Sequence, residues 1–135
     1  MRVLFWYCDV IGWTPTVKTL PDMPDGEPGR HEKIVAAFIH VEPQDVQEGS
    51  AAETKLVKNA KWLARKWDTK DVLLHSFTHL GEKKASPEQS LALIRSAQKR
   101  LSSAGYVATC TPFGHFHDLE LKAPGHPLAR IFKEW

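Results

Sequence analysis

Few features of this 135-residue sequence point away from an ordinary globular domain. It has only two cysteines, Cys8 and Cys110, and both lie in apolar runs, so we expect reduced thiols and a cytoplasmic protein. No apolar run approaches the roughly 18 residues of a membrane span, and no charged-then-apolar leader follows Met1. Net charge is also small, because 18 Lys and Arg oppose 16 Asp and Glu, and this balance alone does not indicate a nucleic-acid partner.

The residues that are present have the composition of a folded protein. Hydrophobic residues make up 42% of the chain, and a chain of this length buries roughly two-thirds of the surface it exposes when unfolded. We therefore expect a single domain over residues 1–135, with a core that needs neither a disulfide nor a structural metal. Length alone does not distinguish a freestanding domain from part of a longer protein.

Apolar runs rich in branched and aromatic side chains predict strands, and those at residues 2–8 and 33–42 are expected to be buried on both faces. The predicted strands are residues 2–8, 33–42, 71–77, 106–111 and 115–122. Residues 9–32 contain four prolines and predict mostly loop, with a short edge strand at residues 17–20. The pattern from Gly125 onward predicts no definite element.

Two helices are predicted between these strands. A stripe with a 3.6-residue period indicates the first, and Ser86-Pro87-Glu88-Gln89 is a capping box that begins the second, which ends at Gly105. The order of elements predicts an α/β fold with both helices against one face of a mixed sheet. The two buried stripes are Leu56, Val57, Ala60, Leu63, Ala64 and Trp67, and Leu93, Ile94, Ala97, Leu101 and Ala104.

Positive charge is concentrated on these helices. Residues 53–70 carry six basic and two acidic side chains, and residues 82–100 carry five and two. On the first helix Trp62 lies off the apolar stripe among basic side chains, where an aromatic ring and positive charge favour contact with a polyanion. The alternative is a solvated helix face with one exposed tryptophan.

The seven histidines suggest a metal site only weakly. His115 and His117 share one face of a strand, and His75 and His79 lie near a strand end, but no cysteine or carboxylate completes a zinc-like spacing. We therefore predict no metal and no cofactor. Polar and aromatic residues at 76–79 and 111–117 follow strand ends, where α/β folds place ligands, although the aromatic rings are equally able to close a sheet edge.

Five segments together resemble, in order and spacing, the N-terminal editing domain of archaeal threonyl-tRNA synthetases, a relative of the D-aminoacyl-tRNA deacylases. The similarity covers nearly the whole chain and is weakest in the proline-containing stretch and the first helix. It implies a D-aminoacyl-tRNA deacylase-like α/β fold, with a mixed sheet, two main helices and a homodimer. The five segments are residues 1–9, 37–42, 77–80, 112–114 and 125–129, of which the last two are the most specific.

The resemblance implies hydrolysis of serine wrongly attached to threonine tRNA. Threonine differs from serine by one methyl group, which a binding pocket distinguishes only about 10–200-fold, so a second sieve is needed. The resemblance implies that His79 occupies the position that contacts the serine side chain. It also implies that residues 112–114 help to enclose the terminal adenosine. The implied substrate-binding residues are Val41, Phe77, Thr78, His79, Pro112, Phe113, Gly114 and Phe116.

Two positions depart from the family pattern. His117 stands where relatives carry lysine, and Arg130 stands where they carry glutamate. A mechanism in which the 2′-hydroxyl of the tRNA and backbone amides activate the water survives both changes. We expect His117 and His79 to be the catalytic candidates, with His117 as a weak base, and Arg130 to contact phosphate.

The expected partners are threonine tRNA carrying serine, a second copy of the chain, and a threonyl-tRNA synthetase catalytic domain or subunit. Further tRNA contacts are expected from Lys58, Lys61 and Arg65 on the first helix. Three alternatives stay open from the residues: a D-aminoacyl-tRNA deacylase, a non-catalytic tRNA-binding module, and a metal hydrolase built on the histidines.

Overall fold

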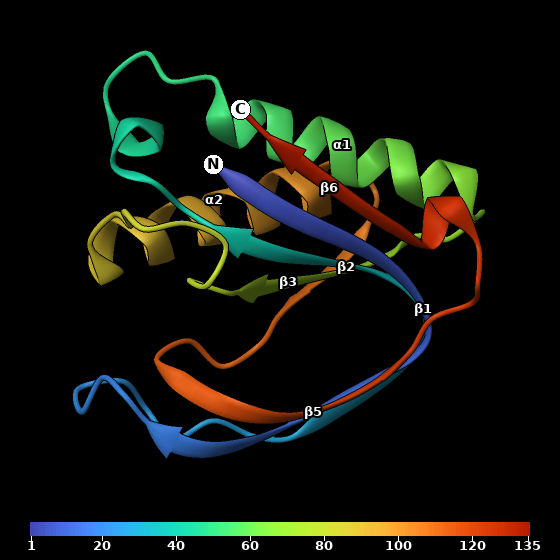
Figure 1. Cartoon of the computed structure of the whole chain (residues 1–135), viewed down its shortest axis with the longest axis horizontal. Helices are drawn as coiled ribbons and strands as arrows, with labels where there is room; N and C mark the ends of the chain where they lie inside the picture. Colours follow the sequence, from blue (N-terminus) through green and yellow to red (C-terminus); the bar gives the residue numbers. More distant parts are fainter.

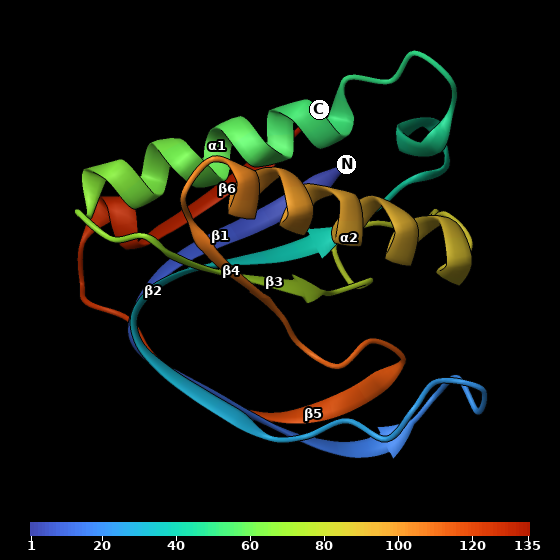
Figure 2. The ribbon, with the colours of Figure 1, turned by 180° about the vertical axis from the view of Figure 1, so that it is seen from behind.

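A mixed sheet of six strands, with two helices on one of its faces, forms the framework seen in Figures 1 and 2. The computed structural model describes all 135 residues. Strand order is β4-β3-β2-β1-β5, and β6 also pairs with β1; the β2–β3 and β3–β4 pairs are parallel and the rest antiparallel. The elements are β1 Arg2–Lys18, β2 Gly29–His40, η1 Pro43–Val46, α1 Ala52–Lys66, β3 Asp71–Ser76, α2 Pro87–Ser103, β4 Val107–Cys110, β5 His115–Lys122, η2 Pro127–Ala129 and β6 Arg130–Glu134.

Strand β1 is long and changes partner along one edge. Residues 2–6 pair with β6, whereas residues 10–18 pair with β5, and β2 pairs with β1 on the other side. Between these two regions the sheet bends, so that β5 and the neighbouring parts of β1 and β2 swing away from the helices (Figures 1 and 2). We call this part the arm: β5, residues 11–18 and residues 29–34.

The prediction that residues 9–32 are mostly loop was wrong. Strand β1 continues to Lys18 and β2 begins at Gly29, which leaves only residues 19–28 as a connection. Pro15 is tolerated because pairing with β2 has already ended at Trp13, so the strand is an edge at that point, and its register with β5 shifts between Pro15 and Lys18. The C-terminal segment, for which no element was predicted, forms η2 and β6.

Both predicted helices are confirmed, and their apolar stripes face the sheet. In α2 the stripe is buried except for Ala104, which is exposed just beyond the last helical residue. The Ser86 hydroxyl accepts a hydrogen bond from the Gln89 backbone N–H at 3.2 Å, as the capping box predicts. At the end of α1, Trp67 is half-buried and stacks on Tyr7 with ring centroids 4.0 Å apart, and its Nε1–H donates to the Leu128 carbonyl.

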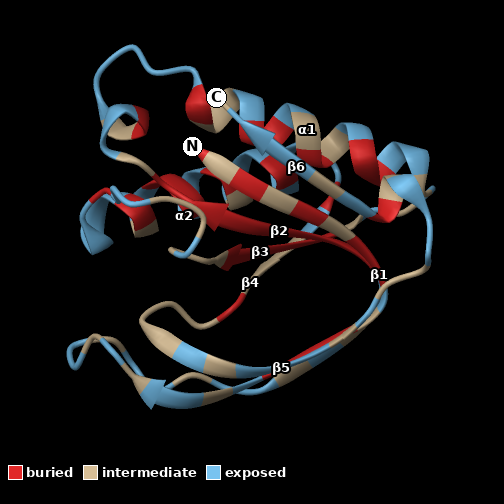
Figure 3. Ribbon diagram, in the orientation of Figure 1, coloured by how far each residue is buried: buried red, intermediate tan, exposed pale blue.

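The core lies on both faces of the sheet. The larger cluster fills the space between the sheet and the helices, with side chains from β1, β2 and β3 alternating toward it. A smaller cluster lies on the opposite face beneath the arm, and Figure 3 shows that much of the arm itself is exposed. Its buried members are Cys8, Ile11, Trp13, Ile34, Ala36, Phe38 and Leu73. Neither helix is long and apolar enough to cross a membrane.

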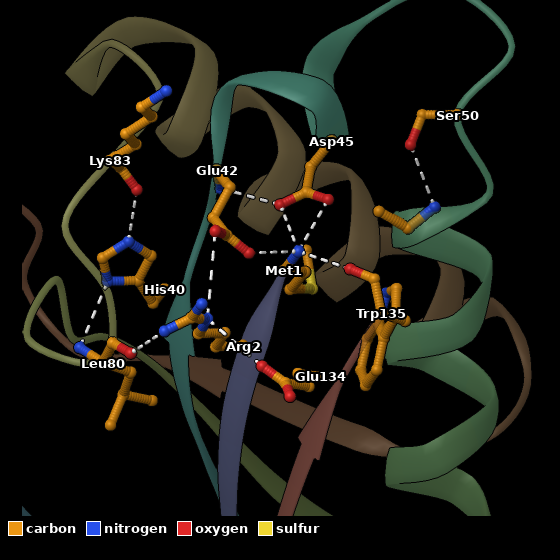
Figure 4. Close-up of polar contacts among 11 residues, drawn as sticks. Met1, Arg2, His40, Glu42, Asp45, Ser50, Leu80, Lys83, Glu134 and Trp135 are labelled. Carbon is orange, nitrogen blue, oxygen red and sulfur yellow. Dashed lines mark hydrogen bonds and ion pairs between the residues drawn. The ribbon is translucent and has the colours of Figure 1, made fainter.

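The α-ammonium group of Met1 is buried and ion-paired (Figure 4). It lies 2.9 Å from Glu42 Oε1 and 2.8 Å from both carboxylate oxygens of Asp45, and it donates to the Trp135 carbonyl at 2.7 Å. Asp45 also accepts a hydrogen bond from the Glu42 backbone N–H. This cluster joins the start of β1, the end of β2, η1 and the last residue of the chain.

Removing one partner of this buried ion pair is expected to be costly. Asp45→Ala leaves the buried Met1 ammonium with fewer acceptors, so we expect the free energy of unfolding to fall by about 3 kcal/mol. Urea denaturation measures this change. The control is Glu48→Ala, an exposed acidic residue nearby, which is expected to change stability by less than about 0.5 kcal/mol. Equal stabilities for the two variants would contradict this account of the cluster.

Candidate active site

Aromatic and histidine side chains form a continuous row on the sheet face opposite the helices. Phe38 is central: its ring centroid lies 6.4 Å from that of Trp6, 4.8 Å from that of His75 and 5.2 Å from that of Phe77. His117, from the arm, meets His75 at 5.5 Å, and His79 meets Phe77 at 4.9 Å. We call Trp6, Phe38, His75, Phe77, His79 and His117 the aromatic row; it brings both predicted catalytic histidines to one cluster.

His75 lies in the middle of the row and is buried. Its Nδ1 is 2.8 Å from the Thr111 hydroxyl, which links the ends of β3 and β4. Burial, with smaller contributions from His117 and His79, lowers the pKa of His75 to about 4. His75 is therefore neutral at pH 7. The sequence suggested His75 only as a weak metal-ligand candidate together with His79, although its place inside the apolar run 72–75 also indicates burial.

His117 projects from β5 toward His75. Its Nε2 atom is buried and has no hydrogen-bond partner in the protein. Burial and then the neighbouring His115 lower the pKa of His117, against the opposing effect of a hydrogen bond to the Pro112 backbone. A neutral imidazole with an unpaired nitrogen is able to exchange a proton with a bound water or hydroxyl group.

His115 links two loops through hydrogen bonds from both of its ring nitrogens. Its Nδ1–H donates to the Phe113 carbonyl at 2.9 Å, and its Nε2 accepts from the Gly26 N–H at 3.3 Å. A carbonyl only accepts and an amide N–H only donates, so these bonds fix the neutral tautomer. Gly26 lies so close to Pro112 that a Cβ there would overlap the proline ring. The 19–28 loop is thereby held against residues 112–114.

A cavity of about 340 Å³ lies between α2, the ends of β3 and β4 and the 19–28 loop. No side chain of the aromatic row lines it, but Thr111, which contacts His75, does. Its size falls in the range of small-molecule sites, and it combines apolar walls with a few polar groups. Of the predicted substrate-binding residues, only Pro112 and Phe113 line it. Its polar side chains include Ser76, Arg95, Gln98 and Thr111.

The other predicted site residues are dispersed. Val41 is buried, and its carbonyl accepts from the Ala85 N–H, while Thr78 is half-buried in the turn after β3. Phe116 is 54% exposed and, lying between His115 and His117 on a strand, points to the opposite face of the arm. The structure therefore does not bring Phe116 to the row. Gly114 takes a positive φ of 76°, and its carbonyl accepts from the Thr19 N–H.

The predicted tRNA contacts lie on two different sides of the molecule. Arg130 donates to the Pro124 carbonyl at 2.6 Å and lies over the Trp6 ring at 5.7 Å, at one end of the aromatic row. Lys58, Lys61 and Arg65 belong to α1, on the opposite face of the sheet, and are exposed or half-buried. Trp62 is 37% exposed beside Lys66.

The two cysteines are unsuited to nucleophilic catalysis. Burial raises the pKa of Cys8 to about 12, with a further contribution from Asp9. Burial likewise raises the pKa of Cys110 to about 11, against the opposing charge of Arg95. Both thiols are protonated at pH 7, and the nucleophile is the thiolate. No group of three or more His, Cys, Asp or Glu side chains is arranged to ligate a metal.

Comparison with known proteins gives a family match over the whole chain. The model for the archaea-specific editing domain of threonyl-tRNA synthetase matches residues 1–135. The threonine–tRNA ligase of Thermococcus onnurineus is 29% identical over 97% of this chain, and that of Nitrosopumilus maritimus is 29% identical over 98%. The chain spans only 22% and 21% of the lengths of these two relatives.

A solved structure shares the fold. The c-Myc DNA Unwinding Element Binding Protein superposes with a TM-score of 0.69 at 13% identity, covering 100% of this chain and 99% of that one. At this identity the likeness concerns the fold alone. It confirms the D-aminoacyl-tRNA deacylase-like α/β fold, with a mixed sheet and two helices.

His75 makes the stability of the protein depend on pH. Between pH 6.5 and pH 4 the unfolded chain protonates this histidine and the folded chain does not, so lowering the pH through this window favours unfolding. We expect wild-type protein to lose about 2–3 kcal/mol more unfolding free energy across the window than His75→Gln. Urea denaturation at several pH values measures the difference, with His31→Gln as the control. Parallel pH profiles for wild type and His75→Gln would refute the assignment.

Proposed function

We propose, because this chain belongs to the archaea-specific editing-domain family of threonyl-tRNA synthetase, that it hydrolyses the ester joining serine to threonine tRNA. The observation that supports this proposal most directly is the aromatic row, where His79 and His117 approach a common cluster from two segments. Residues 1–135 would then form one editing domain, acting in the cytoplasm on tRNA that the synthetase has mischarged. Two copies are proposed to associate as a homodimer.

The proposed reaction uses few protein groups. A water oxygen attacks the ester carbonyl carbon, the bond from that carbon to the ribose oxygen breaks, and the ribose oxygen leaves as a hydroxyl. The neighbouring ribose hydroxyl and backbone amides position the water, and the unpaired Nε2 of neutral His117 takes up its proton and then returns it to the departing ribose oxygen. Protonated cysteines and a histidine without a carboxylate partner favour this substrate-assisted route over a protein triad.

Selection of serine is proposed to occur at the segment 77–79. The half-buried Phe77 and Thr78 supply the wall and backbone groups, and His79, in contact with Phe77, reaches the serine hydroxyl. A wall in contact with the serine β-carbon leaves no room for the extra methyl of threonine. The buried Val41, which anchors Ala85 through its carbonyl, completes this side.

The terminal adenosine is assigned to the neighbouring cavity. Pro112 and Phe113 form one wall, and polar groups such as Ser76 and Arg95 are available to the sugar and base. Gly114 keeps this turn in a conformation that other residues adopt only with strain. Phe116 faces away from the row, so its proposed contact is with substrate outside the row.

Contacts with the tRNA body are proposed for Lys58, Lys61 and Arg65, and Arg130 is proposed to contact a phosphate close to the site. Because α1 and the aromatic row lie on opposite faces of the sheet, the α1 side chains would meet a region of the tRNA away from its 3′ end. Such contacts are with the phosphate backbone and insensitive to sequence.

The proposed activity is tested by deacylation of seryl- and threonyl-tRNA side by side. We expect rapid release of serine and slow release of threonine from threonine tRNA, and a loss of about 100-fold or more in kcat for His117→Ala. The loss in His79→Ala is expected mainly in KM and in discrimination, because this residue is proposed to recognise the side chain. His31→Ala, from the arm outside the row, is the control.

Other outcomes would identify a different activity. Equal cleavage of threonyl-tRNA would contradict proofreading, and faster cleavage of D-aminoacyl-tRNA would favour the chiral relative. Binding of seryl-tRNA without hydrolysis would favour a non-catalytic module, the alternative suggested by the departures from the family pattern at His117 and Arg130.

The basic face of α1 is tested by the salt dependence of tRNA affinity. Replacing Lys58, Lys61 and Arg65 together with alanine is expected to reduce the slope of log K against log salt by up to about 3, because each cation neutralises about one phosphate. Fluorescence anisotropy over a KCl series measures the slope. A charge-matched control replaces the exposed Arg30, Lys122 and Lys133. If both triple variants change the slope equally, α1 is not the interface.

A further inference from the structure

The loop between β3 and α2 carries the proposed selectivity segment, and each of its ends is hydrogen-bonded to the last residues of β2 or to Val41 just after it. The Phe77 N–H donates to the Ile39 carbonyl at 2.8 Å, and the Ala85 N–H donates to the Val41 carbonyl at 2.9 Å. Residues 78–84 form no strand or helix of their own. Their position therefore depends on side chains that reach into the loop.

Two such side chains hold the peptide groups of Leu80 (Figure 4). Arg2 Nη1 donates to the Leu80 carbonyl at 2.8 Å, and the Leu80 N–H donates to His40 Nδ1 at 3.3 Å. His40 Nε2 then donates to the Lys83 carbonyl at 2.7 Å. An amide N–H at one ring nitrogen and a carbonyl at the other fix His40 as the neutral Nε2–H tautomer. Leu80, the residue after His79, is thus held from both sides.

The clamp formed by Arg2 and His40 is itself rigidly supported. His40 is fully buried at the end of β2, and Arg2 lies 3.4 Å from Glu134 and 3.9 Å from Glu42. Burial would raise the pKa of Glu42, but the Met1 ammonium and Arg2 outweigh burial and lower it, so this carboxylate stays charged. A Cβ at Gly81 would come within 3.4 Å of both Arg2 and His40, so the loop backbone packs directly on the pair.

We propose that Arg2 and His40 are positioning residues that set the serine-over-threonine selectivity of the site by fixing Leu80 and, through it, His79. This inference rests on the proposed editing function and deepens it. Excluding a single methyl group requires a wall held to within a fraction of an ångström, and a misplacement of 1 Å in an active site costs about 100-fold. A loop without regular structure reaches that precision only when hydrogen bonds fix its peptide groups. Arg2 and His40 supply such hydrogen bonds to Leu80.

Substitution of Arg2 tests the clamp without disturbing the buried histidine. Its side chain is 37% exposed, so Arg2→Ala is expected to fold. We expect the ratio of seryl to threonyl kcat/KM to fall about tenfold while the melting temperature stays within a few degrees of wild type. The matched control is Arg30→Ala, which removes an exposed arginine of the arm and is expected to leave selectivity equal to that of wild type.

Two substitutions of His40 distinguish the effect of its two hydrogen bonds from the effect of changing the size of its side chain. In His40→Gln the side-chain amide offers one donor and one acceptor, as the neutral imidazole does, whereas His40→Leu offers neither. We expect His40→Gln to retain most of the selectivity and His40→Leu to lose it. Amide hydrogen exchange supplies a readout independent of activity: protection of residues 78–84 is expected to fall in Arg2→Ala and His40→Leu but not in His40→Gln.

The outcomes separate this inference from the proposed function. Wild-type protein that cleaves neither ester would overturn the proposed function and the selectivity role together. Two results would overturn only the selectivity role of Arg2 and His40. In the first, the wild type cleaves seryl-tRNA and Arg2→Ala keeps the same selectivity. In the second, Arg2→Ala and His40→Leu both slow the cleavage of the two substrates equally. Unchanged exchange of residues 78–84 in both variants would show that the loop holds its position without Arg2 and His40.

Discussion

The change of partner along the outer edge of β1 is the constraint on which the site depends. Because β6 pairs with residues 2–6 and β5 with residues 10–18, the same edge supports two strands that lie on different sides of a bend. Within the arm the register of β1 with β5 also shifts between Pro15 and Lys18. A flat sheet would carry His117 away from His75. The bend instead places the His117 ring 5.5 Å from it and encloses the smaller core beneath.

Burial of the histidines beneath the arm then determines their protonation state. Burial disfavours the charged imidazole, so the pKa values of His75 and His117 are both lowered, and these two rings are neutral at pH 7. In the proposed reaction a neutral His117 is able to accept the proton of the water, which the ribose hydroxyl of the substrate helps to position. The helix side of the sheet instead carries the cationic side chains of α1, which are suited to binding phosphate.

Sequence alone predicted the framework well and the connections poorly. Periodicity located both helices and the central strands, because burial on one or two faces leaves a direct pattern in the residues. It failed at residues 9–32, where Pro15 suggested a loop but lies on a strand beyond its last β2 partner. His79 and His117 were identified through family resemblance. His75 was marked only by its place in an apolar run, and its contact with His117 crosses the bend. The contacts of His115 and of the Arg2–His40 clamp join distant segments, so no local pattern predicts them.

The most direct test of this account is a crystal structure with a non-hydrolysable adenosine that carries serine through an amide bond. We predict the seryl group between the segment 77–79 and His117, with the adenosine in the cavity lined by Pro112 and Phe113. A ligand seated on the exposed face of α1, or one that leaves the His117 Nε2 buried and unpaired far from the amide carbonyl, would contradict it.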